Sequence, residues 1–284
     1  MNSIIPSVNF HLWEPCNMRC KFCFATFQDV KQSILPKGHL PKKEALEVIQ
    51  KLVDFGFQKI TFAGGEPTLC PWLTELLKTA KEGGLTTMIV TNGSNLSKEF
   101  LIKNRLYLDW IAISIDSLNE ATNLKIGRAV CGKKVLSIDD YFRIIDDIKQ
   151  QGYRLKINTV VNRENFLEDM NHFLLKTLPE RWKVLQVLPI KGQNDKHIND
   201  FLITPTEFQG FLKRHTQIDS IVPESNDQIK GSYVMIDPAG RFFDNTNGCY
   251  LYSLPINKFG VKKALIEMDY DIKKFNARGG NYDW

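Results

Sequence analysis

The chain has 284 residues, 43% of them hydrophobic and 24% charged, which is enough to bury a sizeable core in one globular domain. Its 37 basic and 32 acidic side chains give a net charge of +5, too small and scattered for a nucleic-acid groove but suited to a compact anionic ligand. The sequence contains no apolar run of about 18 residues that would span a membrane. Its first ten residues lack the charged and apolar regions of a signal peptide. We therefore expect a cytoplasmic protein.

Short β-type runs alternate with helical patterns over the first 190 residues, and Gly56, Gly83 and Gly152 end three of the helices. In chain order we predict a strand at Ser7–Leu12, a helix at Lys42–Phe55, a strand at Lys59–Ala63, a helix at Leu73–Glu82, strands at Thr86–Thr91 and Trp110–Ile115, a helix at Ile138–Gln151, a strand at Arg154–Val160, a helix at Leu167–Lys176 and a strand at Arg181–Pro189. Alternating strands and helices favour parallel strands with helices outside. The prediction is an α/β fold, a partial (βα)6 barrel open on one side.

The alternation fades after about residue 190. Ser232–Ile236 and Arg241–Phe243 flank a turn, and a helix is expected from Val261. We interpret residues 1–190 as the core barrel and residues 191–284 as a C-terminal extension of the same domain that closes the mouth of the barrel and covers the ligand site.

Three of the six cysteines lie in one short run, Cys16-Asn-Met-Arg-Cys20-Lys-Phe-Cys23. Close spacing in a reducing compartment indicates metal binding rather than disulfides. Three thiolates leave one iron of a [4Fe–4S] cluster without a protein ligand, and the amino and carboxylate groups of S-adenosylmethionine (SAM) would chelate that iron. The alternatives are a zinc site, which wants four protein ligands, and three inert cysteines. Cys70, Cys131 and Cys249 are isolated and are interpreted as apolar fillers or surface thiols.

The cysteine loop follows the first strand, and the segment Phe62-Ala-Gly-Gly-Glu-Pro67 follows the second. Both therefore lie at the C-terminal mouth of the barrel, where such folds carry chemistry. This arrangement resembles the radical SAM superfamily, in which the glycine-rich segment receives the amino group of SAM. An ordinary turn, helix caps and core aromatics are the alternatives. On the radical SAM interpretation, SAM contacts are expected from Phe22, Phe24, Gly64, Gly65, Glu66, Asn92, Ser114 and Arg128.

Polar residues recur at every second position in three predicted strands, whereas the intervening positions are apolar. Because side chains alternate between the two faces of a strand, each polar pair shares one face, which we expect to point into the barrel. Three buried cations in one cavity repel one another, so an anionic ligand such as a nucleoside triphosphate is indicated. The alternative is that these strands flank the open side and the cations are solvated. The pairs are Asn9 with His11, Lys156 with Asn158, and Arg181 with Lys183.

Taken together, the motifs resemble viperin and its prokaryotic relatives. The resemblance rests on segments from residue 7 to the C-terminus: Ser7–His11, Cys16–Phe24, Phe62–Pro67, Asn92–Ser94, Ala112–Ser117, Ile126–Arg128, Lys156–Asn158, Arg181–Val184, Val222–Asn226 and Arg278–Tyr282. It implies a radical SAM nucleotide dehydratase that converts a nucleoside triphosphate (CTP, UTP or GTP) to its 3′-deoxy-3′,4′-didehydro analogue. Such analogues terminate viral RNA synthesis, so antiviral defence is implied. The implied cofactors are SAM and a [4Fe–4S] cluster bound by Cys16, Cys20 and Cys23. These three cysteines are also the predicted catalytic residues.

By the same resemblance, Asn9 and His11 would lie near the ribose and α-phosphate, with Lys156, Asn158, Arg181 and Lys183 at the β- and γ-phosphates. Arg278 and Tyr282 belong to the same predicted substrate site. Asn281 replaces a lysine that is common in the family. The expected partners are the nucleotide and an electron donor such as flavodoxin or ferredoxin.

Animal members carry an N-terminal amphipathic helix for membrane attachment, and this chain begins almost at the first strand. We expect a monomer that binds neither membranes nor nucleic acid. Another radical SAM enzyme, acting on a phosphorylated or peptide substrate, is the main alternative. The GTP 3′,8-cyclase within that group needs a second cysteine cluster, and this chain has no such run near its C-terminus. A non-catalytic metal-binding module is the other alternative.

Overall fold

The computed structural model describes residues 4–284, so the first three residues of the predicted core lie outside the described part. Its centre is one ten-stranded sheet in the order β10-β9-β8-β1-β2-β3-β4-β5-β6-β7. Neighbouring strands from β1 to β7 are parallel, β8 is parallel to β1, and β9 is antiparallel to both β8 and β10. The strands are β1 (Ser7–Trp13), β2 (Lys59–Gly64), β3 (Thr86–Thr91), β4 (Trp110–Ser114), β5 (Arg154–Val161), β6 (Arg181–Gln186), β7 (Ile221–Glu224), β8 (Val234–Ile236), β9 (Arg241–Asp244) and β10 (Leu251–Pro255).

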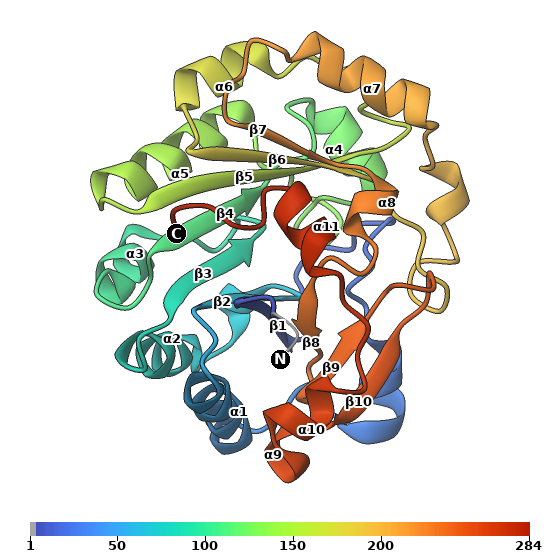
Figure 1. The fold of residues 1–284 in the computed structure, drawn as a ribbon. Helices are drawn as coiled ribbons and strands as arrows, with labels where there is room; N and C mark the ends of the chain where they lie inside the picture. Colours follow the sequence, from blue (N-terminus) through green and yellow to red (C-terminus); the bar gives the residue numbers. More distant parts are fainter. Residues whose placement is uncertain (1–3) are drawn as a thin grey trace.

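Helices cover the outer face of the curved sheet (Figure 1). The apolar face of α1 buries Ala45, Val48, Ile49 and Leu52, and the helix ends at Gly56 in the left-handed conformation. The helices are α1 (Lys42–Phe55), α2 (Leu73–Glu82), α3 (Lys98–Asn104), α4 (Glu120–Ile126), α5 (Ile138–Gln150), α6 (Asn171–Thr177), α7 (Pro205–Arg214), α8 (Asn226–Ile229), α9 (Ile256–Phe259), α10 (Val261–Leu265) and α11 (Ile272–Ala277). Single turns lie at Val30–Ile34, Pro67–Leu69 and Ile198–Asp200.

The predicted α/β fold, with parallel strands and outer helices, is confirmed. The helix predicted at Leu167–Lys176 begins only at Asn171, because Asn162, Asn165 and Asp169 bind backbone groups in the preceding turns. The last predicted core strand ends at Gln186 rather than Pro189. None of the helices in residues 4–284 is long and apolar enough to cross a membrane.

Two strands, β7 and β10, were not predicted. Both are edge strands of the sheet. Pro223 lies inside β7 and Pro255 ends β10, and proline within a strand-like run usually argues against a strand because it cannot donate a ladder hydrogen bond. At an edge that missing donor costs little, so tertiary pairing allows these segments to become strands.

The C-terminal extension contacts both ends of the barrel. At the mouth, the Tyr250 hydroxyl lies 3.1 Å from the carbonyl oxygen of Phe24, next to the cysteine loop. At the opposite end, the ring of Tyr282 packs edge-on against Trp110, the first residue of β4. The chain end lies beside β4, and α11 crosses the space between β7 and β8 (Figure 1). The final segment therefore covers the end of the barrel remote from the cysteines.

Candidate active site

One cavity of about 300 Å³ runs through the inside of the barrel. Its wall is formed by the inward-facing positions of the strands together with the cysteine loop and the C-terminal segment. Of the predicted site residues, every one except Glu66 lines this cavity. They are Asn9, His11, Cys16, Cys20, Phe22, Cys23, Phe24, Gly64, Gly65, Asn92, Ser114, Arg128, Lys156, Asn158, Arg181, Lys183, Arg278 and Tyr282.

The cysteine loop presents three half-buried, free thiols to the cavity. The amide of Met18 lies 3.4 Å from the Cys16 sulfur, and the amide of Cys23 donates to the carbonyl of Cys20 at 3.1 Å. No three His, Cys, Asp or Glu side chains within residues 4–284 converge on a point suited to a single metal ion. Thiolates that each bind a different iron of a [4Fe–4S] cluster need not converge in this way. The donor set and its position therefore fit an iron–sulfur cluster better than zinc.

Two glycines hold the cysteine loop in place. A Cβ atom on Gly65 would collide with the carbonyl oxygens of Glu14 and Pro15, and a Cβ on Gly127 would collide with that of Arg19. A backbone hydrogen bond stabilises the contact between Gly127 and the cysteine loop, since the amide of Arg19 donates to the carbonyl of Gly127 at 3.3 Å. The close approach of three backbone segments is possible because neither glycine has a side chain.

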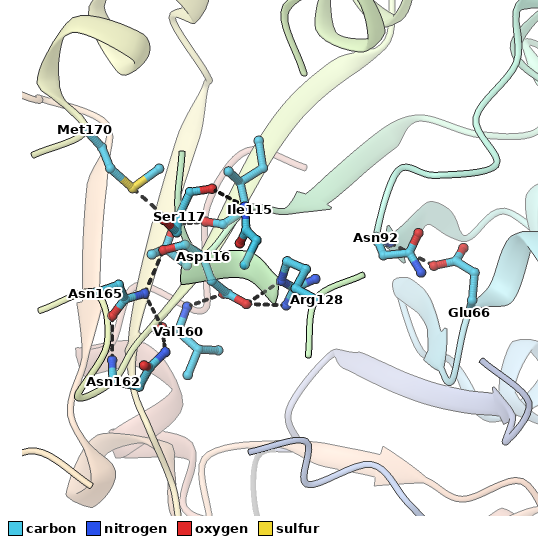
Figure 2. Close-up of polar contacts among 12 residues, drawn as sticks. Glu66, Asn92, Ile115, Asp116, Ser117, Arg128, Val160, Asn162, Asn165 and Met170 are labelled. Carbon is cyan, nitrogen blue, oxygen red and sulfur yellow. Dashed lines mark hydrogen bonds and ion pairs between the residues drawn. The ribbon is translucent and has the colours of Figure 1, made fainter. Parts of the chain in front are cut away.

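Side-chain amides join the cysteine loop to the end of β3. Asn92 donates to the Asn17 side-chain oxygen at 2.8 Å, and Asn17 donates to the Ser94 hydroxyl at 2.9 Å. Glu66 supports this arrangement from behind the wall: its carboxylate accepts from the amide of Asn92 at 2.8 Å and from the hydroxyls of Thr91 and Thr68, each at 2.7 Å. The contact with Asn92 is drawn in Figure 2. Burial raises the pKa of Glu66. A direct contact between Glu66 and SAM stays a prediction.

Arg128 is a buried cation close to Cys20 and Cys23, and a buried hydrogen-bond network fixes it (Figure 2). It pairs with Asp116, whose second oxygen accepts from the amide of Val160 at 2.8 Å. The backbone oxygen of Asp116 accepts from the side chain of Asn165 at 2.6 Å, and Asn165 also binds Asn162. Burial acts to lower the pKa of Arg128, but Asp116 overcomes it and keeps the guanidinium charged. A fixed, buried guanidinium is suited to binding a carboxylate.

The strand register brings the polar pairs together. Lys156 of β5 lies beside Arg181 of β6, and Asn158 lies between Ser114 of β4 and Lys183 of β6. Both polar faces therefore point into the cavity. The side-chain oxygen of Asn158 and Nδ1 of His11 are buried and have no hydrogen-bond partner among the described residues. Unsatisfied buried polar atoms are costly, so these two atoms indicate a polar ligand in the cavity.

The end of the cavity remote from the cysteines is rich in lysine and arginine side chains, and burial and mutual repulsion lower the pKa values of its lysines. Burial, with repulsion from Arg181 and Lys183, lowers the pKa of Lys59 to about 6. Burial and the charges of Lys183 and Lys59 lower the pKa of Lys156 well below its usual value. The pKa of Lys183 is lowered to about 8, mainly by burial. A bound polyanion would stabilise the charged forms of these lysines, because it would offset both the burial and the mutual repulsion of their ammonium groups.

Sequence reasoning missed Lys59, Tyr233 and Glu224 at this end of the cavity. Lys59 begins β2, and Lys59, Thr61 and Ala63 all line the cavity, so the alternation rule used for three other strands applies to β2 as well. Lys59 also lies over the rings of Tyr282 and Trp284, with its Nζ 4.2 Å and 4.8 Å from their centroids. Glu224 has no such sequence signal, because it lies outside the predicted strands. Tyr233 lies in the predicted run Ser232–Ile236, but it shares a strand face with Met235 and not with a second polar residue.

A parallel α/β barrel with a three-cysteine loop at its mouth defines the radical SAM class of enzymes. In agreement, the profile of the Radical SAM superfamily matches residues 14–177. The solved structure of native anSMEcpe with bound AdoMet and Cp18Cys peptide has a TM-score of 0.70 at 15% identity, over 98% of this chain and 84% of that one, and thus shares the fold.

Two curated relatives are more specific. The S-adenosylmethionine-dependent nucleotide dehydratase of Lacinutrix mariniflava is 64% identical over 99% of this chain, which spans 59% of that relative. The S-adenosylmethionine-dependent nucleotide dehydratase of Flammeovirga pacifica is 57% identical over 100% of this chain and 97% of its own length. The chain belongs to this viperin-like family of radical SAM nucleotide dehydratases.

Proposed function

We propose that this enzyme dehydrates the ribose of a nucleoside triphosphate (CTP, UTP or GTP) to give the 3′-deoxy-3′,4′-didehydro analogue. The observation that carries the proposal is the division of a single cavity, with three thiols at one end and a cation cluster at the other. A ligand that needs both ends combines a reactive sugar with several negative charges. Nucleoside triphosphates have this combination, and peptides do not.

The cysteine end of the cavity would hold the cofactors. Cys16, Cys20 and Cys23 are suited to bind three irons of a [4Fe–4S] cluster, and Arg128 is suited to pair with the carboxylate of SAM. When bound, the cluster and SAM supply the one-electron cleavage of SAM that starts radical chemistry. The protein's own contribution is to orient the ribose toward this end and to exclude water from the cavity.

The cation end would hold the triphosphate. Lys156, Asn158, Arg181 and Lys183 form two adjacent rows on β5 and β6, suited to the β- and γ-phosphates. Asn9 and His11 lie on β1 and would face the ribose and α-phosphate. Burial lowers the pKa of His11 to about 4, so its imidazole is neutral near pH 7 and offers a hydrogen bond rather than a charge.

The overall reaction balances as the loss of water from the nucleotide. The hydrogen at C4′ ends in 5′-deoxyadenosine, which forms from SAM together with methionine, and the hydroxyl at C3′ takes up one proton and departs as water. Two electrons enter from outside, one for the cleavage of SAM and one to complete the product. We infer a one-electron donor protein such as a flavodoxin or ferredoxin. The exposed cations Arg19 and Lys21 on the cysteine loop would favour an acidic donor.

The test is to incubate the reduced, cluster-loaded enzyme with SAM and each triphosphate separately, and to measure 5′-deoxyadenosine and the nucleotide product. We expect at least one triphosphate to stimulate 5′-deoxyadenosine formation, with little effect of the corresponding nucleoside. Replacing Lys156 or Lys183 with Ala should weaken triphosphate binding by about 1–3 kcal/mol per lost charged hydrogen bond. Equal turnover of triphosphate and nucleoside would contradict the phosphate assignment.

We also propose a role in antiviral defence, because a nucleotide without a 3′-hydroxyl terminates RNA synthesis. The proposal is supported by the family resemblance. Its test is the plating efficiency of RNA-synthesising phages on cells that express the wild-type chain or its Cys20→Ala variant. Equal plating on both strains would argue against it.

A further inference from the structure

Glu224, at the end of β7, lies just behind the cation end of the cavity and is fully buried. One of its carboxylate oxygens accepts from Lys183 Nζ at 2.7 Å and from Arg278 Nη1 at 3.0 Å. The other oxygen accepts from the hydroxyl of Tyr233. These three partners line the cavity, whereas Glu224 does not. The Glu224 carboxylate therefore binds three side chains that a ligand in the cavity would contact.

The carboxylate is ionised and affects its partners. Burial acts to raise the pKa of Glu224, but Lys183 and Arg278 overcome this effect and lower it. In turn Glu224 raises the pKa of Lys183 against burial and against repulsion from Arg278 and Arg181. Glu224 thus favours the charged form of Lys183, which burial disfavours.

Glu224 also bridges the open side of the barrel. Strand β7 is an edge of the sheet, and Tyr233 lies directly before β8, which pairs with β1 and β9 but not with β7. Arg278 follows α11, the helix that crosses this space in Figure 1. The Arg278 side chain donates to the carbonyl of Ser232 at 2.9 Å as well as to Glu224. One carboxylate therefore joins the sheet edge, the segment before β8 and the C-terminal segment.

We propose that Glu224 is a positioning residue for the triphosphate, which holds Lys183 and Arg278 so that their remaining N–H groups face the cavity. The inference rests on the proposed function and deepens it. An ammonium has three N–H donors, and Lys183 uses two of them, on Glu224 and Tyr233. The third is left for a phosphate. Arg278 likewise keeps N–H groups beyond those bound to Glu224 and Ser232.

A positioning role and simple charge repulsion predict opposite changes in triphosphate affinity when the charge of Glu224 is removed. If Glu224 only repelled the triphosphate, removing its charge would tighten binding. If it positions the cations, Glu224→Gln leaves Lys183 less charged and Arg278 without its ion pair, and binding weakens. Glu82→Gln, at the exposed end of α2, is the matched control for removal of one carboxylate.

The experiment titrates inorganic triphosphate and CTP into the cluster-loaded, SAM-bound enzyme without reductant, by calorimetry. Inorganic triphosphate has no base or ribose, so it reports on the cation end alone. We expect Glu224→Gln to weaken its binding at least tenfold, with SAM affinity unchanged, and to raise KM for the nucleotide more than it lowers kcat. Unchanged or tighter binding would overturn the inference.

A double-mutant cycle separates positioning from general damage to the fold. If Glu224 acts through Lys183, the Glu224→Gln substitution should weaken triphosphate binding much less in the Lys183→Met variant than in the wild type. Full additivity would overturn the proposed route. Glu224→Asp keeps the negative charge on a shorter side chain, so this variant should bind inorganic triphosphate with an affinity between those of the wild type and Glu224→Gln. If the Glu224→Gln variant does not fold, Glu224→Asp takes its place in both the titration and the double-mutant cycle. If the wild type binds neither inorganic triphosphate nor any of CTP, UTP and GTP, the proposed function itself fails.

Discussion

The buried guanidinium of Arg128 and the buried carboxylate of Asp116 form an ion pair whose side chains are 8% and 1% exposed. Because Asp116 also accepts from the amide of Val160, it ties Arg128 to β5. The pair holds Arg128 in the wall of the cavity, close to Cys20. A prearranged cation of this kind binds a carboxylate with little loss of side-chain entropy.

The first prediction concerns this pair. Asp116→Asn should leave Arg128 as a buried, unpaired charge, and breaking a buried ion pair from one side costs up to about 3–5 kcal/mol of stability. We expect the urea midpoint to fall and the dissociation constant of SAM to rise at least tenfold. Urea unfolding and SAM titration of the cluster-loaded protein measure both. Asp139→Asn, on the exposed start of α5, is the control. SAM affinity equal to the wild type would remove Arg128 from the SAM site.

The second prediction tests the packing of the cysteine loop against Gly127. Gly127→Ala should reduce the iron and sulfide bound per chain after anaerobic reconstitution, because a methyl group there collides with the carbonyl of Arg19. Iron and sulfide analysis and the visible absorption spectrum measure the loss.

Gly132→Ala controls for backbone strain. Gly132 has a φ of +71°, close to the +81° of Gly127, but a Cβ there meets no atom within 4 Å. Both substitutions carry the left-handed penalty of about 1–2 kcal/mol, and only Gly127→Ala adds the collision. Equal iron content in the two variants would show that the contact with Arg19 is unimportant.

The third prediction concerns Lys59. Lys59→Met removes a lysine that must lose its proton on folding at pH 7.5, because burial and neighbouring cations lower its pKa to about 6, so the free protein should become more stable. Triphosphate binding should weaken by about 1–3 kcal/mol if Lys59 contacts a phosphate. Thermal unfolding and calorimetry with inorganic triphosphate give the two values. Lys103→Met, which removes a lysine from the exposed side of α3, should change neither. Unaltered binding by Lys59→Met would place Lys59 outside the phosphate site.

The fourth prediction is that triphosphate binding takes up protons. With a pKa of about 6, Lys59 is mostly neutral at pH 7.5, and Lys156 is shifted in the same direction. A bound triphosphate favours the ammonium forms and raises both pKa values, so affinity should fall as the pH rises above about 6. Calorimetry at pH 7.5 in two buffers with different ionisation enthalpies measures the uptake. A binding enthalpy independent of the buffer would contradict this prediction.

Much of the core fold was predictable from the sequence. Helices α1 and α2 and strand β3 have the predicted bounds, because local periodicity and the glycines or turn after them specify where they begin and end. The polar pairs on β1, β5 and β6 line the cavity as the alternation of side chains predicts. The functional roles of these residues stay predictions.

The site was less predictable where it depends on contacts between distant segments. The expected contact of Glu66 with SAM stays a prediction, but the sequence does not indicate that Thr68, Thr91 and Asn92 hydrogen-bond its carboxylate behind the cavity wall. Neither the Gly127 contact with the cysteine loop nor the pairing of β7 at the sheet edge is marked in the sequence.

The sequence by itself determined the three-thiol loop, the parallel α/β core and the strand faces that carry cations, since each depends on spacing within a short segment. Only the tertiary structure decided that Lys59, Tyr233 and Glu224 join that cation cluster and that the C-terminal segment reaches the far end of the barrel. The physical reason is that burial and charge pairing depend on which segments meet in space, and these segments lie far apart in the sequence; Lys59 and Tyr282, for example, are separated by 223 positions.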